Sequence, residues 1–148
     1  MIVLQDTREQ NPWDLTKYGF QQEITKVDTG DYTIKGYEDK FSCERKASTG
    51  EMSINFGKKW KTFAKELKRM KEIEHRYIIC EFPLSHIYTF PSASQIPHQS
   101  WSSLKITSAF LAKRIEEICG DYDITFIFSE DRLDAERKFV EIVNAINN

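Results

Sequence analysis

Residues 28–46 read DTGDYTIKGYEDKFSCERK and decide the fold. The Asp-Thr-Gly-Asp at the start is a turn signal, and the Tyr-Thr-Ile that follows begins a strand. The polar stretch 35–39 turns the chain again, and residues 41–46 follow as the return strand. Residues 31–46 are therefore predicted to form a β-hairpin with acidic groups on both arms.

The hairpin predicts a cluster of charged side chains. Side chains alternate between the two faces of a strand, so Glu44 and Lys46 project from one side while Arg45 points away. The hairpin can lay Asp31 beside that pair, and Asp6 leaves an apolar first strand with its carboxylate available to the same cluster. Carboxylates suit a hard cation such as Mg²⁺ or Mn²⁺, and the backbone carbonyl of Arg45 could add an oxygen ligand.

Such a cluster contains what phosphodiester hydrolysis needs. A metal lowers the pKa of a water molecule and neutralises developing charge, and an ammonium orients the nucleophile or stabilises the transition state. Each motif alone also has an ordinary interpretation. A Gly-Asp pair is usually a turn and a Glu-Arg-Lys triplet is usually a solvated patch, while Asp6 and Glu9 could cap a turn or pair with Arg8.

The three motifs together resemble a known family. Residues 6–10 read DTREQ, and Gly30-Asp31 is followed by Glu44-Arg45-Lys46. This arrangement resembles the XPF-type branch of the restriction-endonuclease-like PD-(D/E)XK nucleases, with its Asp-x-Arg-Glu box, its Gly-Asp and its Glu-Arg-Lys. The resemblance spans most of the chain and implies one XPF-type nuclease domain over residues 1–148, similar to the stand-alone domains of prokaryotes and phages.

The resemblance also implies an activity. The implied activity is that of a Mg²⁺- or Mn²⁺-dependent DNA endonuclease, which would select branched, flap or nicked structures in repair, recombination or replication. Asp31 and Glu44 would be the metal carboxylates, Lys46 the catalytic lysine, and Asp6 an additional metal or water ligand. The residues that would organise the site or hold a phosphate are Arg8, Glu9 and Arg45.

Two departures from the family pattern stand out. The family usually places an aspartate shortly after the lysine of Glu-Arg-Lys, where this chain has Gly50 followed by Glu51. Either Glu51 substitutes one position late or that role is missing. The family's eukaryotic and archaeal members also carry a helix-hairpin-helix module, and nothing in this sequence resembles one.

Residues 57–73 are predicted to form one amphipathic helix. Apolar residues recur there at helical spacing, and lysines take the opposite face. The ordinary interpretation of such a basic face is that it is the solvent-exposed side of the helix. In the nuclease interpretation Lys58 and Lys59 are the best candidates for phosphate contacts, with residues 55–57 setting the helix N-terminus near the active site.

The rest of the pattern predicts an α/β fold. Strands are expected at 2–4 and 20–27 before the hairpin, a central strand at 77–82, a loop at 83–100, a helix at 101–118 ended by Gly120, a strand at 124–128, and a last helix capped by Ser129. This order predicts a restriction-endonuclease-like mixed β-sheet flanked by helices.

Composition constrains the partners and the location. The net charge of −2 and the pI near 6.0 do not themselves indicate a polyanion partner. Residues 57–76, however, carry eight Lys/Arg against three Glu, so a basic patch can exist. Three cysteines without paired spacing, no leader and no membrane-length apolar run favour a cytoplasmic protein. The resemblance to stand-alone nuclease domains implies a prokaryotic cell or a phage-infected host. The expected partners are DNA and either a second copy of the chain or a partner protein, with no membrane.

Two other function classes compete with the nuclease. The same fold can grip DNA, or act as a scaffold, without turnover, which the departure at Gly50 would permit. A phosphate-ester hydrolase acting on small molecules would need a closed pocket, for which the sequence gives no location.

Overall fold

The computed structural model describes residues 1–147 and contains a six-stranded sheet in the order β2-β1-β3-β4-β5-β6. β1 pairs in parallel with β2 and antiparallel with β3, β3 pairs antiparallel with β4, and β4, β5 and β6 are parallel. The predicted mixed sheet is therefore confirmed. The strands are β1 (Ile2–Asp6), β2 (Gln21–Thr25), β3 (Tyr32–Ile34), β4 (Phe41–Lys46), β5 (His75–Cys80) and β6 (Thr125–Phe128).

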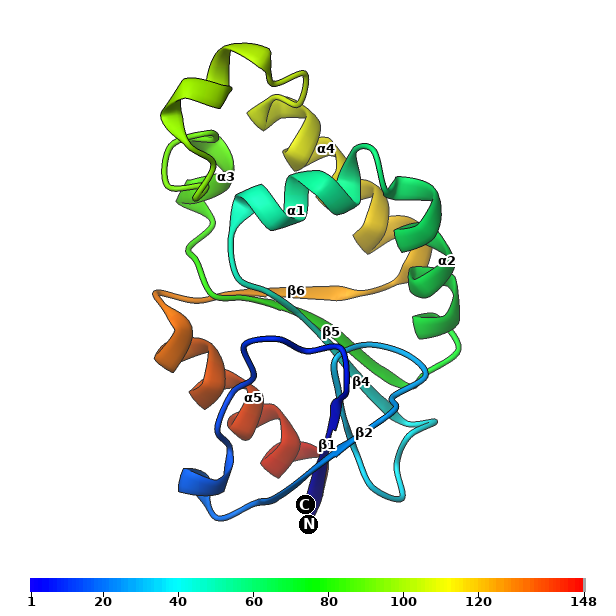
Figure 1. The fold of residues 1–148 in the computed structure, drawn as a ribbon. Coiled ribbons are helices and arrows are strands. Elements are labelled where there is room, and N and C mark those ends of the chain that lie inside the picture. Colours follow the sequence, from blue (N-terminus) through cyan, green and yellow to red (C-terminus); the bar gives the residue numbers. More distant parts are fainter. Residues whose placement is uncertain (148) are drawn as a thin grey trace.

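Helices cover both faces of the sheet, with α1, α2 and α4 on one side and α5 on the other (Figure 1). Met52, Phe56 and Phe63 fill the core on the first side, and Phe139 and Trp13 fill it on the second. The helices are α1 (Thr49–Phe56), α2 (Trp60–Met70), α3 (Ser85–Tyr88), α4 (Ser108–Tyr122) and α5 (Arg132–Asn147), with 3₁₀ turns η1 (Thr16–Tyr18) and η2 (His98–Ser103). Every helix within residues 1–147 is too short or too polar to span a bilayer.

Strand β4 lies between β3 and β5, and all of its residues are buried. Three of them, Glu44, Arg45 and Lys46, carry charges. Buried charges are costly unless they are paired or neutralised, so the surroundings of β4 have to supply compensating groups on both faces of the sheet.

The helix predicted over 57–73 is present as the shorter α2, and a second helix, α1, precedes it where none was predicted. α1 begins after Ser48, whose Oγ accepts a hydrogen bond from the N–H of Glu51 at 3.1 Å. It ends at Phe56, so residues 55–57 lie at the end of α1 and do not open the next helix. The apolar face predicted for α2 is correct, since Phe63 and Leu67 are buried.

The predicted ends of the last two helices are also wrong. α4 continues past Gly120 to Tyr122, and Asp123, with a φ of 52°, takes the left-handed position. Ser129 is buried and does not cap α5, because the carboxylate of Asp131 accepts the N–H of Asp134 at 2.9 Å instead. The predicted loop at 83–100 contains α3 and the start of η2, and β5 is covered on both faces but is second from the edge of the sheet.

Candidate active site

Asp6, Asp31 and Glu44 lie in a row across three neighbouring strands. One residue beyond the last β1–β3 pair, the N–H of Asp6 donates to the carbonyl of Asp31 at 2.8 Å. One residue beyond the β3–β4 pair, Asp31 adjoins Glu44. Because side chains alternate along strands, the three carboxylates belong to the face covered by α1 and α2. The register puts the three acids on one face of the sheet, and that they hold a metal together stays a prediction.

Asp31 is partly buried, and its Oδ2 accepts the N–H of Arg45 at 2.7 Å. Burial raises the pKa of this carboxyl to about 7, and the negative charges of Glu9 and Glu66 add to the rise. The N–H of Arg45 and the ammonium of Lys46 act in the opposite direction without cancelling it. Asp31 is therefore half protonated near neutrality until a positive charge is placed beside it.

Glu44 has one oxygen in use and one without a partner. Its Oε1 lies 3.1 Å from Nζ of Lys46, whereas its buried Oε2 has no hydrogen-bond partner in the described part of the chain. Burial and the neighbouring charge of Asp31 raise the pKa of Glu44 well above its usual value. A buried carboxylate oxygen without a donor is costly and marks a place where a further positive group fits.

Lys46 is enclosed by acids and an aromatic ring. Besides Glu44, its Nζ lies 3.6 Å from Oε1 of Glu51 and 4.8 Å from the ring centre of Phe63. Burial alone would lower the pKa of Lys46, but the carboxylates of Glu44, Glu51 and Asp31 raise it above its ordinary value. The ammonium is therefore charged throughout the neutral range and is held in one place.

Asp6 has both of its carboxylate oxygens engaged within the chain. Oδ1 accepts the N–H of Val27 at 2.9 Å, and Oδ2 accepts Nε of Arg8 at 2.7 Å. Burial would raise the pKa of Asp6, but these two donors outweigh it and lower the pKa. Asp6 thus fixes the end of β1 to the segment after β2, and it offers less to a metal than Asp31 or Glu44.

Arg45 lies on the opposite face of the sheet, as the alternation predicted. Its Nε is 3.6 Å from Glu9 and 3.5 Å from Glu81, and its Nη2 donates to the carbonyl of Asn11 at 2.7 Å. Trp13 also donates its Nε1 to Glu81 at 2.6 Å. The guanidinium is only 4% exposed, so Arg45 ties β4 to the N-terminal segment and does not face the row of acids.

No three His, Cys, Asp or Glu side chains among residues 1–147 are grouped closely enough to form a ready metal cluster. The predicted three-acid cluster is therefore not preformed. Each acid instead accepts a hydrogen bond from a nearby donor: Asp31 from the N–H of Arg45, Glu44 from Lys46, and Asp6 from Arg8. The donor set still suits a divalent cation, because Asp31 and Glu44 adjoin, repel each other, and leave Oε2 of Glu44 without a donor.

The comparisons with known proteins agree with this geometry. The family model described as the ERCC4 domain matches residues 5–141. The chain belongs to the ERCC4 domain family. No curated protein matches it significantly.

Two solved structures share the fold of this ERCC4 domain. XPF from Aeropyrum pernix has a TM-score of 0.72 at 18% identity, and XPF from Aeropyrum pernix in complex with DNA has a TM-score of 0.70 at 18% identity. The alignments cover 100% and 99% of this chain but only 66% and 64% of those chains, so part of each XPF has no counterpart here. The XPF-type family and the restriction-endonuclease-like fold predicted from the sequence are thus confirmed.

The departure at Gly50 has a physical reason in this ERCC4 domain. The N–H of Gly50 donates to the carbonyl of Ser94 at 3.1 Å, and a Cβ at position 50 would lie 2.4 Å from that oxygen. An aspartate at position 50 would force the backbone at Ser94 to move. Glu51, one residue later, instead reaches Lys46, which also holds Glu44.

Lys58 and Lys59 are exposed in the turn between α1 and α2. α1 separates this turn from Ser48, and no contact in the described part of the chain joins the two lysines to the row of acids. Their role in holding phosphates stays a prediction.

Two residues near the site were missed by sequence reasoning. Glu66 accepts the N–H of Gly30 at 3.1 Å, and Glu81 holds Arg45 and Trp13 from the other face. Glu66 falls within the helix predicted over 57–73 and was given no role, and Glu81 falls within the strand predicted at 77–82. Only the packing of α2 on the hairpin would have indicated the first, although the single acid at the end of the apolar run 77–82 was a signal for the second.

Proposed function

We propose that this ERCC4 domain is a metal-dependent DNA endonuclease that hydrolyses phosphodiester bonds. The observation that carries the proposal is the buried, partnerless Oε2 of Glu44 beside Asp31, with the charged Nζ of Lys46 at 3.1 Å. Family membership and the fold shared with an XPF that was solved in complex with DNA support DNA as the substrate. We further propose that residues 1–148 act as one nuclease domain, with a second copy or a partner protein as an additional partner.

Asp31 and Glu44, with the backbone carbonyl of Arg45, are the groups that would hold Mg²⁺ or Mn²⁺. When bound, such an ion lowers the pKa of a water molecule and neutralises charge on the phosphate. The chain itself supplies the acids that select a hard cation and the strand pairing that keeps them adjacent.

Lys46 is the proposed catalytic lysine. Its contacts with Glu44, Glu51 and Phe63 fix the ammonium before substrate arrives, so little reorganisation is needed during the reaction. A charge held in this way stabilises negative charge that develops on the phosphate in the transition state more than charge in the ground state.

The remaining residues position the site or the DNA. Arg8 is 73% exposed while its Nε holds Asp6, so its guanidinium is available to a phosphate at the edge of the site. Glu9 and Arg45 are buried together and act as positioning residues. Lys58 and Lys59 are proposed to contact phosphates farther along the duplex. Phosphate contacts carry no base information, so selection by DNA structure is expected in repair, recombination or replication.

The test is incubation with labelled flap, fork, nicked and single-stranded DNAs in Mg²⁺, in Mn²⁺ and in EDTA. The proposal predicts products with either ion on at least one branched or nicked substrate and none with EDTA. Binding to these DNAs without any metal-dependent product would instead establish a catalytically inactive binding module. Release of phosphate from a small chromogenic ester without DNA cleavage would establish a small-molecule hydrolase.

A further inference from the structure

Glu66 reaches the row of acids from a helix. It lies on α2 between Phe63 and Leu67, which anchor the helix in the core, and its side chain is half-buried. Its Oε1 accepts the N–H of Gly30 at 3.1 Å. Gly30 directly precedes Asp31, so the carboxylate of Glu66 stands next to the turn that delivers Asp31 to the site.

The turn at Gly30 cannot easily move away from Glu66. Gly30 has a φ of +81°, and a Cβ there would lie 2.5 Å from Oγ of Ser42 and 2.9 Å from the carbonyl of Cys43. The hydrogen bond between the carbonyl of Cys43 and the N–H of Asp31 at 2.8 Å fixes the same turn to β4. The position of Glu66 relative to Asp31 is therefore set by packed backbone.

Acids outnumber cations around Asp31, Glu44 and Glu66. Near these three acids, Lys46 is shared by Glu44 and Glu51, and the charge of Arg8, which is bonded to Asp6, also acts on Glu66 and Asp31. Negative charge is thus in excess around the buried oxygen of Glu44 that has no donor.

We infer that Glu66 is the third acidic residue of the metal site, in the role that the sequence pattern had given to Asp6. It joins Asp31 and Glu44 when the ion binds, because no such group of three acids is preformed among residues 1–147. This inference rests on the proposed function. The oxygens of Asp6 are taken by Arg8 and by the N–H of Val27, whereas Glu66 has one hydrogen bond to a main-chain amide and a second oxygen on a partly exposed side chain. Oxygen-rich sites bind divalent ions more tightly as the number of charged ligands rises.

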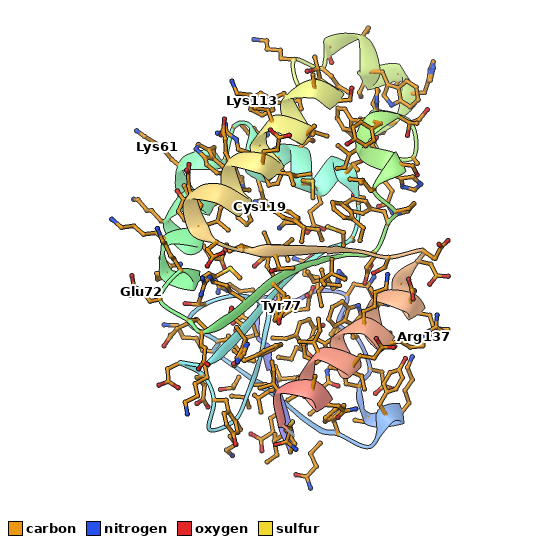
Figure 2. All side chains as sticks on the ribbon, turned by 180° about the vertical axis from the view of Figure 1, so that it is seen from behind. Lys61, Glu72, Tyr77, Lys113, Cys119 and Arg137 are labelled. Carbon is orange, nitrogen blue, oxygen red and sulfur yellow. The ribbon has the colours of Figure 1, made fainter. Side chains whose placement is uncertain are left out.

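The alternative is that Glu66 only holds the turn at Gly30. Glu66→Gln separates the two roles, because the amide oxygen of glutamine can still accept the N–H of Gly30 while the negative charge is lost. Glu72→Gln is the matched control. Glu72 is exposed, just beyond the end of α2, and projects from the outer edge of the molecule (Figure 2).

The experiment is calorimetric titration of Mn²⁺ into wild type, Glu66→Gln and Glu72→Gln, with the melting temperature of each variant measured without metal. We expect Glu66→Gln to bind Mn²⁺ about tenfold more weakly or worse, because a charged ligand is lost, while its melting temperature stays within the range of the control. Equal Mn²⁺ affinity in all three proteins would overturn the role of Glu66 and leave the proposed function intact. Absence of Mn²⁺ binding by the wild type would contradict both.

Discussion

The two faces of the sheet at the end of β4 each carry one cation and a larger number of carboxylates, in different arrangements. On one face Arg45 stands between Glu9 and Glu81, its Nη2 donates to the carbonyl of Asn11, and Trp13 donates to Glu81. On the other face a single ammonium, that of Lys46, stands among Glu44, Glu51 and Asp31.

From this difference we infer that the Arg45 cluster is structural and that the Lys46 cluster is the active site proposed above. Around Arg45 each of the two carboxylates lies near the guanidinium, and the cluster joins the N-terminal segment to β4 and β5. Around Lys46 an oxygen of Glu44 is left without a donor, and the raised pKa of Asp31 and of Glu44 reflects burial and mutual repulsion. In the first cluster Nε of Arg45 also lacks a hydrogen-bond acceptor among the described residues, but two acids of the chain lie beside its charge. We propose that a cation and a substrate complete the second cluster.

The largest expected effect of a substitution is a loss of folding stability when the cluster around Arg45 is broken. Arg45→Met leaves Glu9 and Glu81 buried without their counter-charge, which destabilises a protein by roughly 3–5 kcal/mol. Urea denaturation should show this loss, and Glu81→Met added to Arg45→Met should recover part of it. An Arg45→Met protein as stable as the wild type would remove the structural role of this cluster.

Lys46→Met should act on turnover and leave the fold largely intact. Methionine keeps the packing against Phe63, and Glu44 can take up a proton when its partner is lost because its pKa is already raised. Removing one preorganised electrostatic group costs about 10²–10³ in rate. Single-turnover cleavage of the preferred DNA measures this, and near-normal cleavage by Lys46→Met would exclude Lys46 as the catalytic lysine.

The pH dependence of stability provides a smaller test. The folded pKa of Asp31, about 7, lies above its unfolded value of 3.8, so the folded chain holds an extra proton between these values. The metal-free wild type should therefore lose stability relative to Asp31→Asn as the pH rises from about 4 to about 7, since stability falls wherever the native state binds more protons.

Melting curves of both proteins across that range, with and without saturating Mg²⁺, measure the effect. Mg²⁺ binds the ionised carboxylates, so it should raise the melting temperature of the wild type more than that of Asp31→Asn at pH 7. Parallel curves for the two proteins in all conditions would remove Asp31 from the metal site.

The smallest expected effect concerns the exposed lysines. If Lys58 and Lys59 contact phosphates, the double alanine variant should make the plot of log affinity against log salt shallower by roughly 1.5–2 units. Binding of Glu44→Gln protein, with and without the double substitution, to two unrelated duplexes gives the slopes. An unchanged slope would show that both lysines are ordinary solvated residues of the turn between α1 and α2.

The strands and the row of acids could be predicted because short-range rules determine them. Alternation along residues 41–46 was enough to put Arg45 on the face opposite Glu44 and Lys46, and the turn signal at Gly30 was enough to place Asp31 beside them. Those rules depend on neighbours in the chain and in the hairpin, which the sequence shows directly.

The errors arose where tertiary packing overrides local preference. Residues 49–56 include Thr, Gly, Ser and Asn, which are weak helix formers, and α1 forms because Met52 and Phe56 are buried against the sheet. The same kind of long-range contact brings Glu66 to Gly30, and the donors that occupy Asp6 come partly from Val27, which lies after the next strand. No spacing in the sequence reports these contacts.

The central claim is that the residues on the Glu44 and Lys46 face of β4 hydrolyse DNA with the help of a divalent ion. Its most direct test is cleavage of a labelled fork or nicked duplex by purified wild type and Glu44→Gln protein, each in Mg²⁺ and in EDTA. Glu44→Gln removes one carboxylate from the site and leaves the Arg45 cluster unchanged. The account predicts product only for the wild type in Mg²⁺, and equal product from both proteins, or product in EDTA, would contradict it.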